Sequence, residues 1–254
     1  MIKSGDLMNK VVLITGARTG IGRACAIKFA KMGYDIILNY HTSDVLELKK
    51  ELETYKVKVL DIKCDLKNEE EIKNMVNHGI TEFNHIDVLI NNAAVEYNSD
   101  FFDKDKAKFM ETLEVNLVAP FLISKYVSKY MIKNKYGKIV NISSNNAINK
   151  NDPTTLEYDA SKAGLISLTH NLALELKPFV NVNAVAPGWV MTEKVKKIND
   201  SLDGMLEKEE KKKILLNKIA DPSDIANVVY FLSSDEANYI NNQVIIVDGG
   251  VIWV

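Results

Sequence analysis

Short, continuous apolar segments alternate with helix-length segments along the whole chain, and this alternation is the feature that most constrains its fold. Several of these segments, such as VVLI, IIL, VLI and VIIV, are apolar at every position instead of every second one. Strands that are covered on both faces of a sheet have this pattern, so a parallel sheet is expected. The seven predicted strands are residues 10–16, 35–40, 58–65, 86–94, 138–144, 180–186 and 243–248.

Helix-length stretches separate the predicted strands. They cover residues 20–32, 44–55, 68–83, 104–134, 156–176 and 222–233. Strands that alternate with helices form right-handed βαβ units. We therefore predict an α/β protein with a single-domain, doubly wound (Rossmann) fold, in which helices flank a mostly parallel seven-stranded sheet.

Residues 193–216 interrupt this rhythm. They are rich in Lys and Glu, and their loop-like composition suits a mobile lid over a substrate. No internal repeat and no linker divides the 254 residues, so we expect one domain over residues 1–254, with a lid at 193–216.

Charge and hydropathy exclude several classes of protein. Lys and Arg number 32 against 34 Asp and Glu, so no strong field attracts nucleic acid or an anionic membrane. No apolar run approaches the ~20 residues of a membrane span, and the first residues lack the apolar core of a signal peptide. We expect a cytoplasmic protein in which Cys25 and Cys64 are reduced core thiols, because neither has a CxxC partner. The four histidines show no metal-ligand spacing, so no metal is expected.

The first predicted strand runs directly into the sequence TGARTGIG, residues 15–22, and then into a helical pattern. Glycines let the backbone turn sharply, and they let a diphosphate approach the N–H groups at a helix N-terminus. The spacing G-x-x-x-G-x-G differs from the commonest dinucleotide fingerprint. Taken alone, these glycines are compatible with a tight loop as well as with a phosphate-binding turn.

Several motifs, in order along nearly the whole chain, resemble those of the classical short-chain dehydrogenases/reductases. The matching segments are TGARTGIG (15–22), NNAA (91–94), EVNL with Asn116, YDASK (158–162) and Pro187-Gly188. Two departures stand out: Ala94 replaces a glycine, and the serine of the active site is either Ser143 or Ser144. Ser144 fits better, although its gap to Tyr158 is one residue longer than the family pattern.

The resemblance implies an oxidoreductase whose catalytic residues are Asn116, Ser144, Tyr158 and Lys162. Tyr158 and Lys162 are four residues apart, so on a helix they share one face. A phenol has a reference pKa of about 10, and a neighbouring ammonium would lower it, so that Tyr158 exchanges a proton with a carbonyl oxygen. Ser144 would hydrogen-bond that oxygen. By resemblance, Lys162 also holds the nicotinamide ribose and Asn116 supports a proton-relaying water.

An isolated YxxxK is more often an exposed pair, and its weight here comes from the other motifs. The short spacing argues against the related enoyl-thioester reductases, so we expect carbonyl chemistry.

The identity of the dinucleotide depends on the end of the second strand, where an acid would accept the ribose hydroxyls of NAD. That position is Tyr40, and neither Asn39 nor His41 supplies an acid. With Arg18 in the glycine turn, NADP(H) is favoured and NAD(H) stays open, because Arg18 could equally point to solvent. Asp65 resembles an adenine-contacting acid but also fits a strand-end turn. The predicted cofactor-binding residues are Gly16, Arg18, Thr19, Gly20, Ile21, Gly22, Tyr40, His41, Asp65, Leu66, Asn92, Ala93, Ala94, Tyr158, Lys162, Pro187, Gly188, Val190 and Thr192.

The resemblance is greatest to the 3-oxoacyl-[acyl-carrier-protein] reductases of fatty acid biosynthesis, through DPSDIA (221–226) and VDGG (247–250). The same segments occur in sugar and polyol dehydrogenases, which are the alternative. A non-catalytic dinucleotide sensor is less favoured because both Tyr158 and Lys162 are present. An acidic carrier protein would need basic surface. The candidates are Lys129, Lys133, Lys135, Lys138 and Lys177, although a solvated face in a Lys-rich chain is the favoured explanation of these lysines.

The predicted helix 156–176 is apolar on more than one side. Leu165, Leu168, Leu172 and Leu176 form one stripe, and Ile166 and Ala173 lie on another. One stripe can cover the sheet while the other needs a partner, so we expect a homo-oligomer. The resemblance, in which this helix and the long helix before it pair across a two-fold axis, implies a tetramer.

Overall fold

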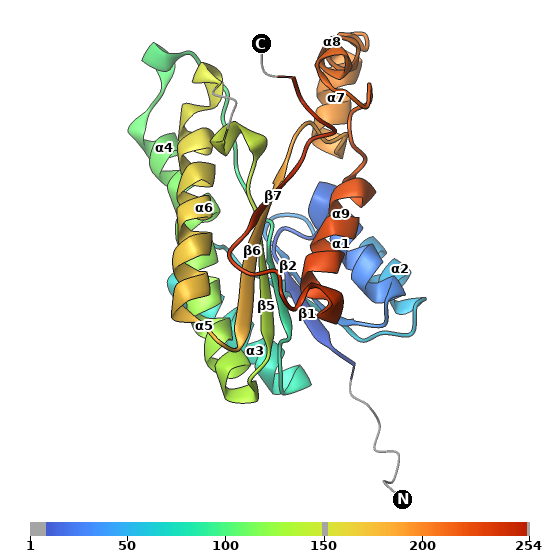
Figure 1. The fold of residues 1–254 in the computed structure, drawn as a ribbon, viewed down its shortest axis with the longest axis vertical. Helices are drawn as coiled ribbons and strands as arrows, with labels where there is room; N and C mark the ends of the chain where they lie inside the picture. The colour runs from blue at the N-terminus through green and yellow to red at the C-terminus, as the bar shows by residue number, and fades with distance from the viewer. Residues whose placement is uncertain (1–8, 149–151, 253–254) are drawn as a thin grey trace, which may run out of the picture.

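A seven-stranded parallel sheet forms the centre of the molecule (Figure 1). The computed structural model describes residues 9–148 and 152–252. The strand order β3-β2-β1-β4-β5-β6-β7 places a topological switch point between β1 and β4, and the predicted fold is confirmed. The strands are β1 (Val11–Ile14), β2 (Asp35–Tyr40), β3 (Val59–Lys63), β4 (Val88–Asn91), β5 (Gly137–Ile142), β6 (Val180–Pro187) and β7 (Val244–Val247).

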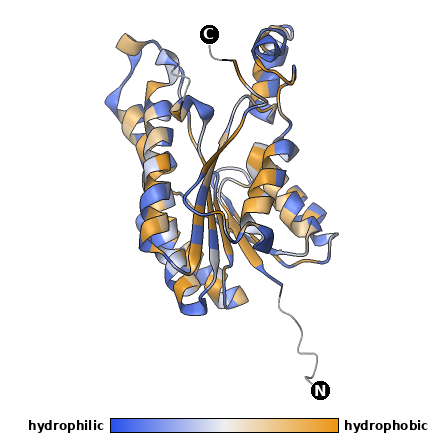
Figure 2. Ribbon diagram, in the orientation of Figure 1, coloured by the Kyte–Doolittle hydropathy of each residue, from blue (hydrophilic) through white to orange (hydrophobic). Residues whose placement is uncertain are grey.

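Helices cover both faces of the sheet, which explains why strands such as β1 are apolar at every position (Figure 2). Val12 and Ile14 of β1 face one core cluster, while Val11 and Leu13 face the other, and all four are fully buried. One face carries α1 (Gly20–Lys31), α2 (Leu46–Glu53) and α9 (Pro222–Ser233), and the opposite face carries α3 (Glu69–Phe83), α5 (Ala119–Asn134) and α6 (Leu156–Glu175).

The predicted helix 104–134 is wrong as a continuous element. The chain forms α4 (Lys106–Leu113), then a π-helical turn (Glu114–Val118), then α5. The turn contains the buried Asn116, whose carboxamide bonds to the backbone of Val95. Single π turns inside α-helices re-aim side chains in this way.

The segment 193–216 is also not loop-like. It folds into α7 (Glu193–Ser201) and α8 (Met205–Glu210), which project beyond the sheet (Figure 1). Thr192 caps α7 by accepting a hydrogen bond from the N–H of Val195 at 3.3 Å. The side chain of Asn199 accepts from the N–H of Glu207 at 2.9 Å, and Gly204, with φ +78°, turns the chain between the helices. The hydrogen bonds of Thr192 and Asn199 satisfy N–H groups in the first turns of α7 and α8, so this polar segment forms helices.

The apolar side chains of α6 are distributed between its buried and exposed faces differently from the prediction. Ala173 lies on the buried face with Leu165 and Leu176, while Leu168 and Leu172 are half-buried. The apolar side chains that α6 exposes include Leu156 and Leu174.

The lysines proposed as a carrier-protein surface are placed differently from the expectation. Lys129, Lys133 and Lys135 lie near the end of α5, and Lys177 follows α6, so they lie at the edge of the sheet where β5 and β6 begin. Lys138 is buried, and its ammonium donates to Asn181 at 3.0 Å and to Asn238 at 2.6 Å. It is therefore not a surface residue.

Both cysteines are core thiols, as expected. Cys25 and Cys64 are buried, and burial raises the pKa of each thiol to about 12. Within residues 9–148 and 152–252, no helix has the length and apolar character to cross a membrane.

Candidate active site

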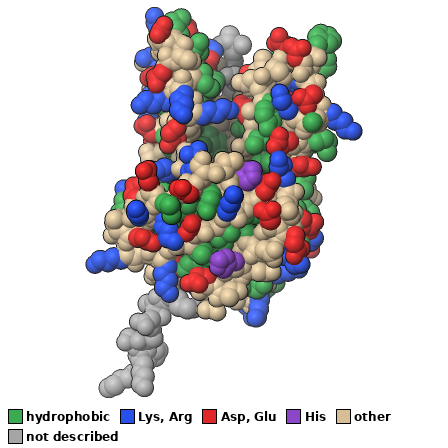
Figure 3. All heavy atoms as spheres, turned by 180° about the vertical axis from the view of Figure 1, so that it is seen from behind, with side chains coloured by type: hydrophobic (Ala, Val, Ile, Leu, Met, Phe, Trp, Pro, Cys, Tyr) green, Lys and Arg blue, Asp and Glu red, His purple; other side chains and the backbone are tan. Residues whose placement is uncertain are grey.

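A cleft runs along the edge of the sheet where the strands end, beside the switch point between β1 and β4. It consists of two adjoining cavities of about 410 and 290 Å³, which share Ile21, Asn92, Ala94, Thr192 and Lys194 as lining residues. We call the larger one the turn cavity, because the glycine turn lines it, and the smaller one the tyrosine cavity, because Tyr158 lines it. Figure 3 shows the molecule hollowed between its two upper projections, with charges of both signs interspersed over the visible face.

The glycine turn between β1 and α1 is built to bring backbone N–H groups to the cleft. Gly16 and Gly20 have φ values of +61° and +57°, which favour glycine. A Cβ at Gly16 would lie 2.9 Å from the Cα of Ala93, so only a glycine fits against the end of β4. The N–H of Gly20 donates to a carboxylate oxygen of Glu193 at 2.8 Å. The turn therefore already holds an anionic group where a dinucleotide diphosphate would bind, and it fits such a cofactor.

Gly22 does not line the cleft, unlike the other predicted cofactor residues. A Cβ there would lie 2.5 Å from both the Asn92 side-chain nitrogen and the Gly16 carbonyl oxygen. Gly22 thus permits close packing behind the turn. The Asn92 amide fixes the turn in place by donating to the carbonyls of Thr15 at 2.9 Å and Gly16 at 3.1 Å.

The remaining predicted cofactor residues line one or both cavities. Those in the turn cavity are Gly16, Arg18, Thr19, Gly20, Ile21, Tyr40, His41, Asp65, Leu66, Asn92, Ala93, Ala94 and Thr192. Those in the tyrosine cavity are Ile21, Asn92, Ala94, Tyr158, Lys162, Pro187, Gly188, Val190 and Thr192. Sequence reasoning did not single out Asn39, Lys67, Glu111, Val115, Glu193 and Lys194 at the turn cavity, because no motif marks them.

The far end of the turn cavity, at the end of β2, is lined by both basic and acidic side chains. The exposed Arg18 lines it from the glycine turn, and His41 lies 3.6 Å from an oxygen of Asp65. Asp65 also accepts from the N–H of Lys67 at 3.0 Å, so it forms the strand-end turn and lines the cavity at once. The last residue of β2 is Tyr40, so no acid stands at that position.

Three predicted catalytic residues meet in the tyrosine cavity. Lys162 is 2% exposed, its ammonium lies 5.5 Å from the centre of the Tyr158 ring, and it donates to the carbonyl of Ile142 at 2.7 Å. Ser144 is hydrogen-bonded to Tyr158. The hydroxyl of Ser143 instead donates to the carbonyl of Lys162 at 3.0 Å. This geometry favours Ser144 over Ser143 as the serine that faces a substrate.

The pKa values differ from the sequence expectation. Burial raises the pKa of Tyr158 above its usual value, the charge of Glu96 raises it further, and the hydrogen bond with Ser144 lowers it. Burial lowers the pKa of Lys162 to about 8. The expected lowering of the phenol pKa is wrong for this structure, because burial of the phenol raises its pKa more than its neighbours lower it.

Asn116, the fourth predicted catalytic residue, lies behind the cleft. Its amide donates to the carbonyl of Val95 at 2.9 Å and to Ser161 at 3.0 Å, and its oxygen accepts from the N–H of Val95 at 2.8 Å. The side chain is therefore engaged in holding the loop after β4 in place.

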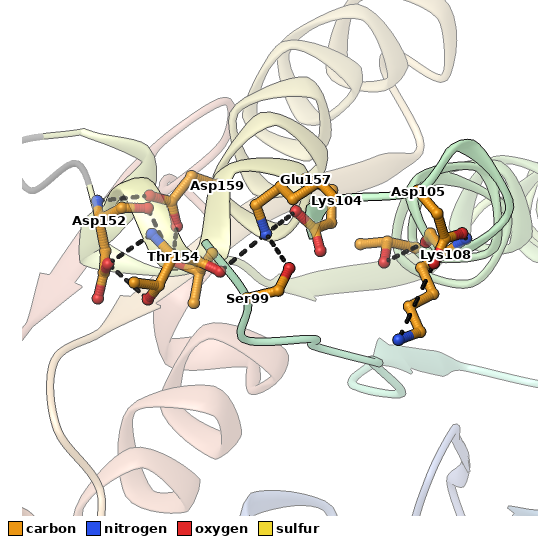
Figure 4. A network of polar contacts seen from close by, with 10 residues as sticks. Ser99, Lys104, Asp105, Lys108, Asp152, Thr154, Glu157 and Asp159 are labelled. Carbon is orange, nitrogen blue, oxygen red and sulfur yellow. Dashed lines mark hydrogen bonds and ion pairs between the residues drawn. The ribbon is translucent and has the colours of Figure 1, made fainter. Parts of the chain in front are cut away.

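A polar network ties the loops at the tyrosine cavity to the start of α6 (Figure 4). Lys104, from the loop after β4, forms a 2.7 Å ion pair with the buried Glu157 and donates to the carbonyl of Thr154 at 2.8 Å. Asp159 accepts from the N–H of Asp152 at 3.0 Å. Glu157 and Asp159 stand on either side of the candidate catalytic tyrosine, so both loops are positioned relative to it.

The outer lining of the tyrosine cavity is polar. Glu96, Asn98, Asn145 and Asn146 contribute carboxylate or amide groups. Trp189 contributes an indole whose N–H donates to Glu210 of α8 at 2.9 Å. Such groups can bind a ligand that carries several hydroxyls.

Comparison with known proteins agrees with this geometry. A family model described as enoyl-(acyl carrier protein) reductase matches residues 16–252. The chain is 36% identical to a 3-oxoacyl-[acyl-carrier-protein] reductase of Thermotoga maritima, over 97% of the chain and 99% of that protein. It is also 36% identical to a short-chain dehydrogenase/reductase of Armillaria gallica, over 100% of both. The structure of L-sorbose reductase from Gluconobacter frateurii, complexed with NADPH and L-sorbose, superposes with a TM-score of 0.92 at 28% identity, over 97% of each chain.

Proposed function

Because this chain belongs to the short-chain dehydrogenase/reductase family, we propose that it is an NADP(H)-dependent oxidoreductase that interconverts a ketone and a secondary alcohol. The observation that carries this proposal is the meeting of Ser144, Tyr158 and Lys162 in a cavity that adjoins the glycine turn. A non-catalytic sensor of dinucleotides would not need these three side chains together.

The roles of the residues follow from their positions. The N–H groups at the start of α1 would hold the diphosphate of the cofactor, whose nicotinamide supplies or accepts the hydride. Tyr158 donates a proton to the carbonyl oxygen during reduction, and Ser144 hydrogen-bonds the same oxygen. In this structure, burial raises the pKa of Tyr158 and keeps the phenol protonated. Release of its proton to a substrate needs a positive charge beside it, and Lys162 is the cationic side chain whose ammonium lies near the ring. The carbonyl of Ile142 holds the ammonium of Lys162 in the cavity beside the phenol.

The lining at the end of β2 supports NADP(H). We expect the protein to bind NADPH more tightly than NADH, because Arg18 and His41 line the cavity and β2 ends at Tyr40 instead of an acid. Tyr40→Asp should shift the ratio of the two dissociation constants toward NADH by about tenfold, because a carboxylate repels a 2′-phosphate. Fluorescence titration of both cofactors measures the ratio, and Tyr40→Phe is the uncharged control. Equal or tighter binding of NADH by the wild type would contradict this cofactor assignment.

The proposed substrate is a 3-oxoacyl thioester, the class named for the relative from Thermotoga maritima. The predicted lysine surface does not support a carrier protein beside the chain's own cleft, since those lysines lie at the opposite edge of the sheet. A second candidate, a sugar or polyol, is favoured by the amide and carboxylate lining of the tyrosine cavity and by Trp189. The name of the L-sorbose reductase supports the same alternative.

One absorbance panel at about 340 nm, where the reduced nicotinamide absorbs, tests both substrate classes. We expect NADPH oxidation with acetoacetyl thioesters, and the panel adds L-sorbose for reduction and glucose and small polyols for oxidation. Turnover of the sugars or polyols without thioester reduction would replace the substrate class and leave the reaction class standing. Failure with every substrate, together with failure to bind NADPH, would overturn the proposed function.

Two further features belong to this proposal. We propose that the segment 193–216, which forms α7 and α8, acts as a lid, because Lys194 and Val195 in the first turn of α7 line the tyrosine cavity. The apolar side chains on α6, including Leu156 and Leu174, are 37% and 60% exposed and support assembly into a homotetramer. Sedimentation at micromolar concentration tests the assembly, and a monomer alone would contradict it.

A further inference from the structure

The carboxylate of Glu193 lies against the glycine turn. Its oxygen accepts a hydrogen bond at 2.8 Å from the N–H of Gly20, although the two residues are 173 positions apart. Gly20 is the first residue of α1, and Glu193 is the first residue of α7. The side chain of Glu193 therefore reaches across the cleft from the lid to the start of α1.

This N–H group is one that a diphosphate would use. The first N–H groups of a helix lack partners within the helix, and the helix dipole favours an anion beside them. A carboxylate satisfies Gly20 in the same manner as a phosphate oxygen. Since both groups are negatively charged, they repel each other strongly at such a short separation, and the carboxylate has to leave before a diphosphate binds there.

A second contact beside the first holds the same turn of α7 across the cleft. The ammonium of Lys194 forms a 2.7 Å ion pair with Glu96, in the loop after β4. Lys194 lines both cavities, and Glu96 lines the tyrosine cavity. Two adjacent residues of opposite charge thus connect α7 to the glycine turn and to the loop at the candidate catalytic site.

We propose that Glu193 is an internal competitor of the cofactor diphosphate: it lowers the affinity for the dinucleotide and is displaced from the glycine turn when the dinucleotide binds. This inference rests on the proposed function only in taking the turn cavity as a dinucleotide site. Displacement of Glu193 leaves the Lys194–Glu96 ion pair to hold α7 on the substrate side. Cofactor binding thereby removes one of the two contacts that hold the first turn of α7 across the cleft.

The test is Glu193→Ala. We expect its dissociation constant for NADPH to fall about five- to tenfold, because the displaced charge and its hydrogen bond are gone. In calorimetric titration, the Glu193→Ala variant should also bind ADP, which carries a diphosphate, more tightly than the wild type by a similar factor. Its affinity for adenosine, which has no phosphate, should not change. The gain for NADPH should shrink as the salt concentration rises, since the repulsion is electrostatic.

Glu209→Ala is the matched control. It removes one carboxylate from the same lid segment, and Glu209 pairs with Lys212 on the exposed surface instead of with the turn. Glu193→Gln keeps the shape of the side chain without its charge, and it should reproduce most of the gain. Circular dichroism melting confirms that each variant is folded.

Unchanged or weaker NADPH binding by both Glu193 variants would overturn the inference, and so would an equal gain for adenosine. A wild-type protein that does not bind NADPH would instead overturn the proposed function. The two failures are therefore distinguishable.

Discussion

Tyr158→Phe is expected to lower turnover by about a thousandfold while it leaves NADPH binding within about twofold of the wild type. The substitution removes one hydroxyl and almost no volume, so the tyrosine cavity keeps its shape. That hydroxyl is the proton donor in the proposed reduction, and the phenylalanine side chain has no proton to donate in its place. The phenyl ring stays beside Lys162, so the cofactor site keeps its ammonium.

The measurement pairs steady-state turnover with fluorescence titration of NADPH. Tyr126→Phe is the matched control, because it removes the same atom from a tyrosine on α5 whose hydroxyl bonds to Glu69 on the exposed surface. A Tyr158→Phe variant that keeps more than about a tenth of its turnover would defeat the assigned role, since general acid catalysis contributes more than that.

Lys162→Met has the second large effect, and three quantities should change together. Turnover and NADPH affinity should both fall by more than about tenfold, because the ammonium is assigned to the proton transfer and to the ribose. The empty protein should be more stable at pH 7, because the charged side chain is 2% exposed and its burial is unfavourable. An increase in melting temperature of about 2 to 6 °C is expected for a chain of this size.

The pH dependence gives the sign of this effect. Burial lowers the pKa of Lys162 to about 8 from its usual value of 10.5. Between these values the unfolded chain binds a proton that the folded chain has released, so wild-type stability rises with pH there. The gain in folding stability of Lys162→Met over the wild type should therefore be largest below about pH 8 and should shrink as the pH rises above that value.

The affinity of the wild type for NADPH should fall with rising pH while its stability rises, because the proposed contact between Lys162 and the cofactor ribose needs the protonated ammonium. Wild-type affinity should decline as the pH rises through about 8, and Lys162→Met should lose that inflection. Lys133→Met, on the exposed end of α5, is the control for both measurements. An unchanged inflection in Lys162→Met would show that another group titrates.

Sequence alone predicted the parallel sheet with helices on both faces and the residues that line much of the candidate site. Strands such as VVLI are apolar on both faces because helices cover both faces, and the parallel sheet follows from that pattern. Helix α9 begins at Pro222, as predicted, because the residues that cap it, Asp221 and Asp224, are its neighbours in the sequence. The glycine turn and the four-residue spacing of Tyr158 and Lys162 are also local, and both are present as predicted.

Only the tertiary structure decided what lies beside those residues. It showed that Lys138 is buried, that Asn116 holds the loop after β4, and that Ser143 bonds to the backbone of α6. It also reversed the expected direction of the Tyr158 pKa, because the removal of water depends on every segment packed around the phenol.

The contact between Glu193 and Gly20 is the clearest example of a feature that the sequence could not predict. Capping and strand patterns are set by residues within a few positions, so the sequence carries them directly. A hydrogen bond between residues 173 positions apart depends on where two helices are placed by the whole sheet, and no local pattern encodes that placement.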